Sequence, residues 1–180
     1  MRHHELVTHE SGTGHRAQLV DWLSKHIQLH RAFGRNADWP YGSIEELVLS
    51  LGRWGLPAPL PPGRARGPER MCYANAASYA ESHDLTYVEG YALTYVGFVC
   101  AHAWCVDADG RVHDPTWRDD VGVAYLGIPF SAGYARTFTE KFGSACLLHD
   151  AHLDEFRILR EGLPVDATVP IGEPIGTRAS

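Results

Sequence analysis

The chain has 180 residues, of which 44% are hydrophobic and 21% are charged, a composition that is typical of one folded globular domain. Its formal net charge of −6 argues against binding to nucleic acid or to an anionic membrane, because either partner requires a basic face. No stretch approaches the roughly 20 apolar residues of a membrane span, and the N-terminus lacks the apolar run of a signal peptide. We therefore expect a cytoplasmic protein with no nucleic-acid or membrane partner.

Both ends of the chain differ in composition from the middle. Residues 1–14 are polar, rich in histidine and glycine, and show no hydrophobic periodicity, so we expect a flexible arm in front of a domain at 15–162. Within that domain, apolar residues recur at helical spacing over 17–33 and predict an amphipathic helix. Prolines and glycines after residue 162 predict an extended, partly disordered tail over 163–180.

A short helix and a long loop come next. Ser43, followed three residues later by Glu46, has the form of a capping box and predicts a helix that ends at Gly52. Residues 55–70 contain five prolines and three glycines, which exclude regular structure and predict a loop that faces the substrate. Residues 71–82 are rich in alanine and free of glycine and proline, which favours a helix.

The second half of the chain predicts an α+β fold. Segments rich in β-branched and aromatic residues indicate antiparallel strands, which we expect to pack against the helix at 71–82. After the strands we expect a loop with one short apolar run, a helix, a short strand or buried run, and a last short element. The predicted strands are 85–93, 96–106 and 111–116, and the later segments are 117–129, 132–142, 144–148 and 154–160.

Four cysteines are too few for a disulfide scaffold, and we expect them to be free thiols in a reducing compartment. Cys72 lies in the first turn of the helix predicted at 71–82, where unpaired N–H groups and the helix dipole favour a thiolate. It is therefore the candidate nucleophile. We interpret Cys100, Cys105 and Cys146 as small core residues.

His102 and Asp114 are the candidate partners of this thiol, and the turn between them decides whether they can meet. In an antiparallel pair, side chains alternate between the two faces of the sheet. His102 and Asp114 therefore share one face only if the numbers of directly opposed residues sum to an even value. A three-residue loop at 108–110 gives such a register and places Gly110 in the left-handed position that these loops favour. A two-residue turn would put Asp114 on the other face, so the candidate triad depends on the longer loop.

The residues around this hairpin resemble those of a known family. His102-Ala103-Trp104, a hairpin and Asp114-Pro115-Thr116-Trp117, preceded by a cysteine at the start of a helix, are similar to the transglutaminase-like core of the papain-like cysteine enzymes. The resemblance covers about residues 70–118. It implies a cysteine helix packed on an antiparallel sheet that carries histidine and aspartate on adjacent strands.

By position, the resemblance implies that Cys72 is the nucleophile, His102 the base and Asp114 the residue that orients the base. Members of this superfamily include protein crosslinkers, peptidases and deglycosylating amidases, so the implied reaction is acyl transfer from an amide. The thiolate would attack the carbonyl, and the acyl-enzyme would pass to water or to an amine without any cofactor. The expected partner is a peptide or protein amide substrate.

Three aromatic residues near these positions, Tyr73, Trp104 and Trp117, are candidates for substrate contact. For Trp104 and Trp117 the alternative is a packing role, in which their rings shield the imidazole. Glu89 lies among aromatic residues of a predicted strand, and its carboxylate points either into the cleft or into water. We assign no role to Glu89 on sequence grounds.

Two other interpretations remain open. A metal site would combine Cys100, His102, Cys105 and His113, but strand alternation places residues 100 and 102 opposite to 105, and the chain has no Cys-x-x-Cys pair. We therefore expect no metal. In the second alternative the same fold is a binding module, whose inactive centre recognises a peptide or protein through an aromatic cleft.

Overall fold

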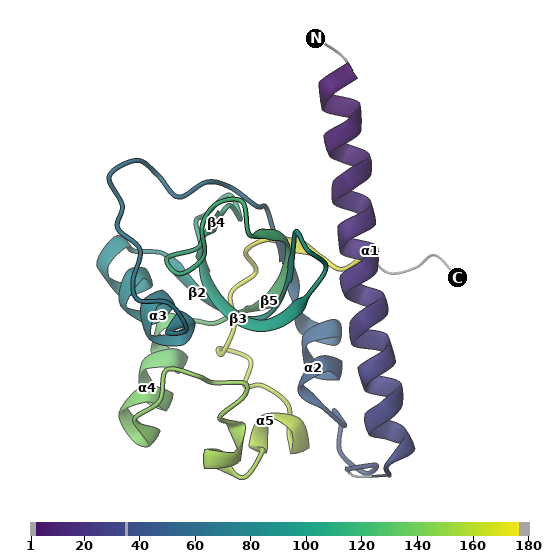
Figure 1. Ribbon diagram of the computed structural model, residues 1–180. Helices are drawn as coiled ribbons and strands as arrows, with labels where there is room; N and C mark the ends of the chain where they lie inside the picture. The colour runs from purple at the N-terminus through teal and green to yellow at the C-terminus, as the bar shows by residue number, and fades with distance from the viewer. Residues whose placement is uncertain (1–2, 35, 177–180) are drawn as a thin grey trace.

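A curled antiparallel sheet of six strands, surrounded by helices, forms the centre of the computed structural model, which describes residues 3–34 and 36–176 and side chains from residue 12 onward (Figure 1). The strand order is β4-β3-β2-β5-β1-β6. The strands are β1 (Arg53–Gly55), β2 (Thr86–Thr94), β3 (Val99–Val106), β4 (Val112–His113), β5 (Gly122–Pro129) and β6 (Glu173–Pro174). The helices are α1 (His3–Ala32), α2 (Ile44–Leu51), α3 (Cys72–His83), α4 (Ala132–Phe142), the 3₁₀ helix η1 (Ala151–Asp154) and α5 (Arg157–Arg160).

Helix α1 is longer than the helix predicted at 17–33. Leu19, Leu23 and Ile27 form its buried stripe, as the periodicity indicates. The helix begins at His3, so residues 3–14 are helical, whereas the sequence predicted a flexible arm over 1–14; residues 1–2 lie outside the described residues. Once the packed turns of a helix exist, further turns add readily, and no proline interrupts this segment.

Helix α2 has the predicted cap. The Glu46 N–H donates to Ser43 Oγ over 3.3 Å, and the Glu46 carboxylate accepts from the Gly42 N–H over 3.0 Å. The carboxylate thus reaches back one residue further than in the usual capping box. Gly52 ends the helix, as predicted.

The loop between β3 and β4 has the predicted length. The Asp107 N–H donates to the Arg111 carbonyl over 3.2 Å, and Gly110 has φ +77°, a left-handed conformation. This confirms the register that puts Asp114 on the same face as His102.

Strand β4 pairs only at Val112 and His113, whereas the sequence predicted a strand over 111–116. Two features end it early. Pro115 has no N–H to donate to a neighbouring strand, and the Asp114 carboxylate accepts hydrogen bonds from the backbone N–H groups of Thr116 and Trp117. Because β4 is short, the first half of β3 lies at an edge of the sheet.

Strand β5 corrects the prediction of a loop over 117–129. Residues 122–129 form a central strand between β2 and β1, which is itself an element that the sequence did not predict. The apolar run 123–128 is continuous rather than alternating because both faces of the sheet are covered.

The remaining predicted elements differ in how well they agree with the structure. Helix α3 and strands β2 and β3 agree within three residues at either end, and α4 matches the prediction at 132–142. Residues 144–148 are a buried run without a strand. The segment predicted at 154–160 contains the last residue of η1 and the whole of α5. The described tail, 163–176, is extended but attached, because β6 pairs with β1 and Ala167 is fully buried; residues 177–180 lie outside the described residues.

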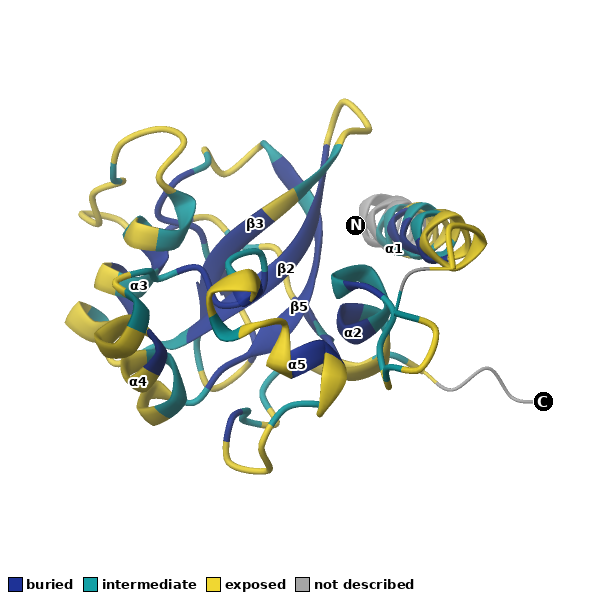
Figure 2. Cartoon of the chain, turned by 90° about the horizontal axis from the view of Figure 1, so that it is seen from below, coloured by how far each residue is buried: buried dark blue, intermediate teal, exposed yellow. Residues whose placement is uncertain are grey.

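Both faces of the sheet are buried, as the dark strands among the helices of Figure 2 show. Alternation along β2 sends Tyr87, Tyr91 and Leu93 into the main core under the helices. The opposite face carries a second apolar cluster, which Trp117 and Ile171 border. The second cluster consists of Val88, Ala92, Trp104, Val106, Val112 and Tyr125.

Candidate functional site

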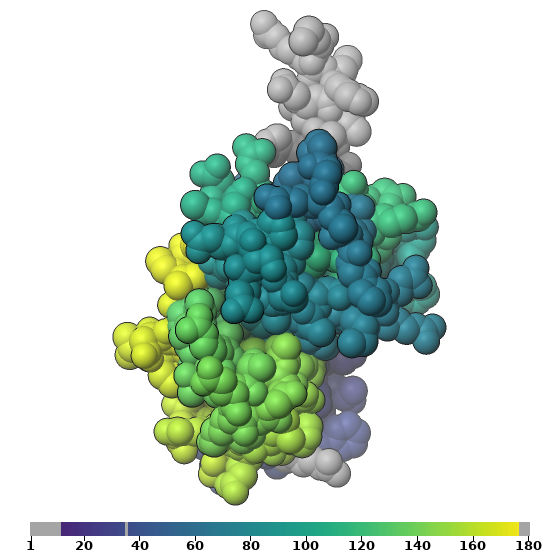
Figure 3. Space-filling model, turned by 90° about the vertical axis from the view of Figure 1, so that its left-hand side faces the viewer, coloured from purple at the N-terminus to yellow at the C-terminus, as the bar shows by residue number. Residues whose placement is uncertain are grey.

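The candidate site lies where α3 begins, beside the edge half of β3. Cys72 is the first residue of α3 and is half-buried, and its preceding residue, Met71, makes no side-chain capping bond to the helix N-terminus. The Cys72 thiol lies close enough to His102 to raise the pKa of its ring. The irregular loop before α3, α3 itself and α4 form much of the surface seen in Figure 3.

The His102 side chain extends from β3, and the residue is only 2% exposed. Its Nε2 atom lies 2.8 Å from Asp114 Oδ2, so Nδ1 is the ring nitrogen left to exchange a proton with the thiol. Burial lowers the pKa of His102, but the hydrogen bond to Asp114, the Cys72 thiol and the charges of both raise it above its ordinary value. The site therefore favours the charged imidazolium.

Asp114 is held by four hydrogen bonds. Its Oδ1 atom accepts from the backbone N–H groups of Thr116 and Trp117, each over 2.9 Å, in the manner of an Asx turn. Its Oδ2 atom accepts from the Tyr125 hydroxyl over 3.1 Å and from His102. This carboxylate is preorganised to orient the imidazole, and it is 6% exposed.

Sequence reasoning missed Tyr125, because the segment that carries it was predicted to be a loop. In the structure it extends from β5 into the second apolar cluster. Burial and the charge of Asp114 raise the pKa of the Tyr125 phenol, so its hydroxyl stays protonated as a donor. The continuous apolar run around it is the sequence signal that would have indicated a buried strand.

The two tryptophans have different positions. Trp117 is half-buried and stacks on the His102 ring at a centroid distance of 3.8 Å and an interplanar angle of 12°. Trp104 is completely buried and packs edge-on against Tyr125, so it has no surface to offer a substrate. The candidate substrate contact at Trp104 is therefore corrected to a packing role, whereas the one at Trp117 stays a prediction.

Tyr73, the third candidate for substrate contact, turns toward the other face of the sheet. Its ring lies 6.4 Å from that of His149, and its hydroxyl interacts with Cys146. Burial, together with the charges of Cys146, Glu89 and Cys72, raises the pKa of this phenol. Substrate contact by Tyr73 stays a prediction.

Asn75 ties the nucleophile helix to the segment that carries Asp114. Its Nδ2 group donates to the Thr116 hydroxyl over 2.9 Å and to the Pro68 carbonyl over 2.8 Å. Gly67 allows this close approach, because a Cβ atom there would lie 2.1 Å from the Asn75 side-chain oxygen. The loop before α3 is thus bound to the site on two sides.

Glu89 lies on the β2 face opposite to His102 and is completely buried. It accepts hydrogen bonds from the Tyr87 hydroxyl over 2.7 Å, from the Leu148 N–H over 2.9 Å and from the Leu147 N–H. Burial raises its pKa to about 7, although the three donors act in the opposite direction. The sequence analysis assigned no role to Glu89. In the structure, its hydrogen bonds to Leu147 and Leu148 attach the segment after α4 to the sheet.

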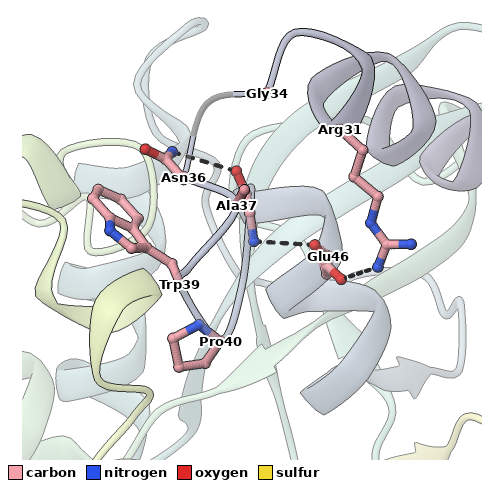
Figure 4. A pocket seen from close by; sticks show the side chains of 8 residues that line it. Arg31, Gly34, Asn36, Ala37, Trp39, Pro40 and Glu46 are labelled. Carbon is pink, nitrogen blue, oxygen red and sulfur yellow. Dashed lines mark hydrogen bonds and ion pairs between the residues drawn. The ribbon is translucent and has the colours of Figure 1, made fainter.

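A pocket of about 390 Å³ lies at the turn between α1 and α2, separate from Cys72 and His102 (Figure 4). Arg31 and Glu46 form an ion pair in its wall, so the two charges compensate each other. Within the part of the chain that the structure describes, its wall contains no cysteine or histidine. The lining residues are Arg31, Gly34, Asn36, Ala37, Trp39, Pro40, Gly42 and Glu46.

Comparison of the chain with protein-family models, with curated proteins and with solved structures finds no match. Among the described residues, no three side chains of His, Cys, Asp or Glu are grouped so that they could hold a metal ion. Over the same ranges, no helix is both long and apolar enough to cross a bilayer. The geometry around Cys72 is therefore the basis for any functional interpretation.

Proposed function

We propose that the protein is a cysteine-dependent amide hydrolase or acyltransferase that uses Cys72, His102 and Asp114. One observation carries the proposal: the His102 ring is bound to Asp114 through Nε2, and the nearby Cys72 thiol raises the pKa of the same ring. A thiol, an imidazole and a carboxylate in this order form the arrangement that activates a nucleophile. The resemblance to the transglutaminase-like core supports the same assignment.

The mechanism begins with transfer of the Cys72 proton to Nδ1 of His102. The thiolate attacks the carbonyl carbon of the amide, and the imidazolium returns the proton to the nitrogen that leaves. Water or an amine, deprotonated by His102, then attacks the thioester and releases Cys72. Asp114 stabilises the imidazolium in both steps through its hydrogen bond with Nε2.

The proposal predicts that Cys72 reacts with iodoacetamide at neutral pH faster than the other three cysteines, which mass spectrometry of the labelled peptides would measure. His102→Ala should slow this labelling by about ten-fold or more, since a positioned base contributes about 10²–10⁴ in rate. His113→Ala, on the next strand, serves as the matched control and should leave the rate unchanged.

Turnover is the second part of the test. Release of amine from a panel of peptide amides should require Cys72, and Cys72→Ala should abolish it. Equal and slow labelling of all four thiols, together with no turnover, would contradict the proposal.

A catalytically inactive peptide-binding module is the second candidate. It is favoured by the exposed apolar tip of the β2–β3 hairpin, where Tyr95, Val96 and Phe98 are 62%, 57% and 71% exposed. The two functions differ in one measurement. A binding module retains peptides on a column while Cys72 labels no faster than Cys100.

A further inference from the structure

Two of the four thiols differ from the others in exposure. Cys72 and Cys100 are half-buried, whereas Cys105 and Cys146 are buried. The Cys105 thiol donates to the Ala76 carbonyl over 3.1 Å, inside the contact between α3 and β3. A solute oxidant therefore has access to Cys72 and Cys100 before it reaches the other pair.

The two half-buried thiols are also neighbours of one another. Cys100 and His102 occupy alternate positions of β3, so their side chains share a face, about 7 Å apart along the strand. Cys72, at the start of α3, is close enough to both residues to interact electrostatically with His102 and with Cys100. Strand β4 leaves this half of β3 without a neighbour, which gives the start of α3 room to approach Cys100.

We infer that Cys72 is a peroxide-sensitive modification site and that Cys100 is its resolving thiol, so that a reversible disulfide between them inactivates the candidate active site. The inference shares the Cys72 site with the proposed function on which it rests, but it needs this thiol to react with peroxide rather than with an amide. A disulfide occupies the sulfur that would attack the substrate, and it removes the proton that His102 would accept. Oxidised protein is therefore inactive, and a reducing agent restores it.

The oxidation takes place in two balanced steps. The Cys72 thiolate attacks one oxygen of the hydroperoxide, the O–O bond breaks, and the products are a sulfenic acid and water or an alcohol. The Cys100 sulfur then attacks the Cys72 sulfur, the S–O bond breaks, and a second water leaves with the Cys100 proton. In total, two thiols lose two electrons and two protons, and the peroxide is reduced.

The order of the steps follows from the surroundings of each thiol. Burial and the neighbouring Cys72 raise the pKa of Cys100, so it remains a thiol at neutral pH and is the slower nucleophile toward peroxide. Cys72 has the imidazolium beside it and reacts first. Without Cys100, the sulfenic acid has no partner and proceeds to the irreversible sulfinic acid.

Hydrogen peroxide applied to the full-length protein tests the inference, with intact-mass and peptide-mass spectrometry as readout. We expect the wild-type protein to lose two hydrogens and to yield a Cys72–Cys100 linked peptide. Dithiothreitol should then restore iodoacetamide labelling of Cys72 completely. Cys100→Ala should instead gain two oxygens at Cys72 and stay blocked after dithiothreitol, whereas the matched control Cys146→Ala should behave like the wild type.

Each other outcome has a distinct meaning. Rapid alkylation of Cys72 combined with a sulfinic acid in the wild type, or with a disulfide between two protein molecules, overturns this inference and leaves the proposed function standing. Slow alkylation with an intramolecular disulfide supports the inference and contradicts the proposed function. Slow alkylation without any disulfide overturns both.

Discussion

At the scale of single residues, the Asp114 carboxylate depends on a phenol that is distant in sequence. Tyr125→Phe removes one of four donors to a buried charge, so we expect the free energy of unfolding to fall by about 1–2 kcal/mol. The carboxylate should also orient His102 less firmly, which would slow iodoacetamide labelling of Cys72 several-fold.

A matched phenol separates these two effects. Tyr91 donates its hydroxyl to Glu45 over 3.0 Å, on the other face of the sheet. Tyr91→Phe should cost similar stability in urea unfolding and leave the labelling of Cys72 unchanged. Equal labelling rates in the two variants would show that Tyr125 has a structural role only.

At the scale of elements, the contact between α3 and the segment after β4 determines where the nucleophile lies. Asn75→Ala removes the bonds to Thr116 and Pro68, and Thr116→Val removes only the first. We expect each variant to slow labelling of Cys72, and their coupling in a double-mutant cycle to be about 0.5–1.5 kcal/mol, the size of one hydrogen bond.

Two controls complete the cycle. Thr116→Ser keeps the hydroxyl and should restore the rate. Ser82→Ala, at the far end of α3, removes a bond inside the helix and should leave Cys72 unaffected. A coupling near zero would mean that the helix is positioned by packing alone.

The elements also show how far the sequence could lead. The hairpin register depends on local features, namely alternation and a glycine in a left-handed position, and so Asp114 could be placed beside His102 from the sequence. The partners Tyr125 and Asn75 depend on which distant strand lies beside β2 and on how α3 packs. No periodicity within one segment contains that information.

Errors elsewhere have a similar origin. The segment at 122–129 is interrupted by Gly127 and ends at Pro129, two residues that are rare inside strands, and its lack of alternation reflects burial on both faces. The helix over 3–14 has no apolar stripe of its own. It continues the packed turns that follow it, which is an effect of cooperativity rather than of local composition.

At the scale of the whole molecule, Glu89 makes stability depend on pH. Its pKa is raised from 4.5 to about 7, so between these values the folded protein binds more protons than the unfolded chain. The free energy of unfolding should therefore fall as pH rises through this window, by about 3 kcal/mol in total from this group. His102 contributes in the same sense, because its pKa is also raised.

Urea unfolding from about pH 5 to about pH 8 would measure this dependence. Glu89→Gln should be less stable at low pH, since its NH₂ group replaces one of the two oxygens that accept from the N–H groups of Leu147 and Leu148, and its stability should vary less with pH. Glu81→Gln, on the exposed surface of α3, should keep the wild-type slope. An unchanged slope in Glu89→Gln would assign the pH dependence to other groups.

The stack of Trp117 on His102 makes the imidazole optically visible. A charged imidazolium in contact with an indole quenches its fluorescence by accepting an electron from the excited ring. The emission of Trp117 is the difference between the spectra of the wild type and of Trp117→Phe. It should be weak at acid pH and increase as His102 loses its proton, at a pH above the ordinary pKa of histidine. The protein thus carries its own reporter of the protonation state on which the candidate chemistry depends.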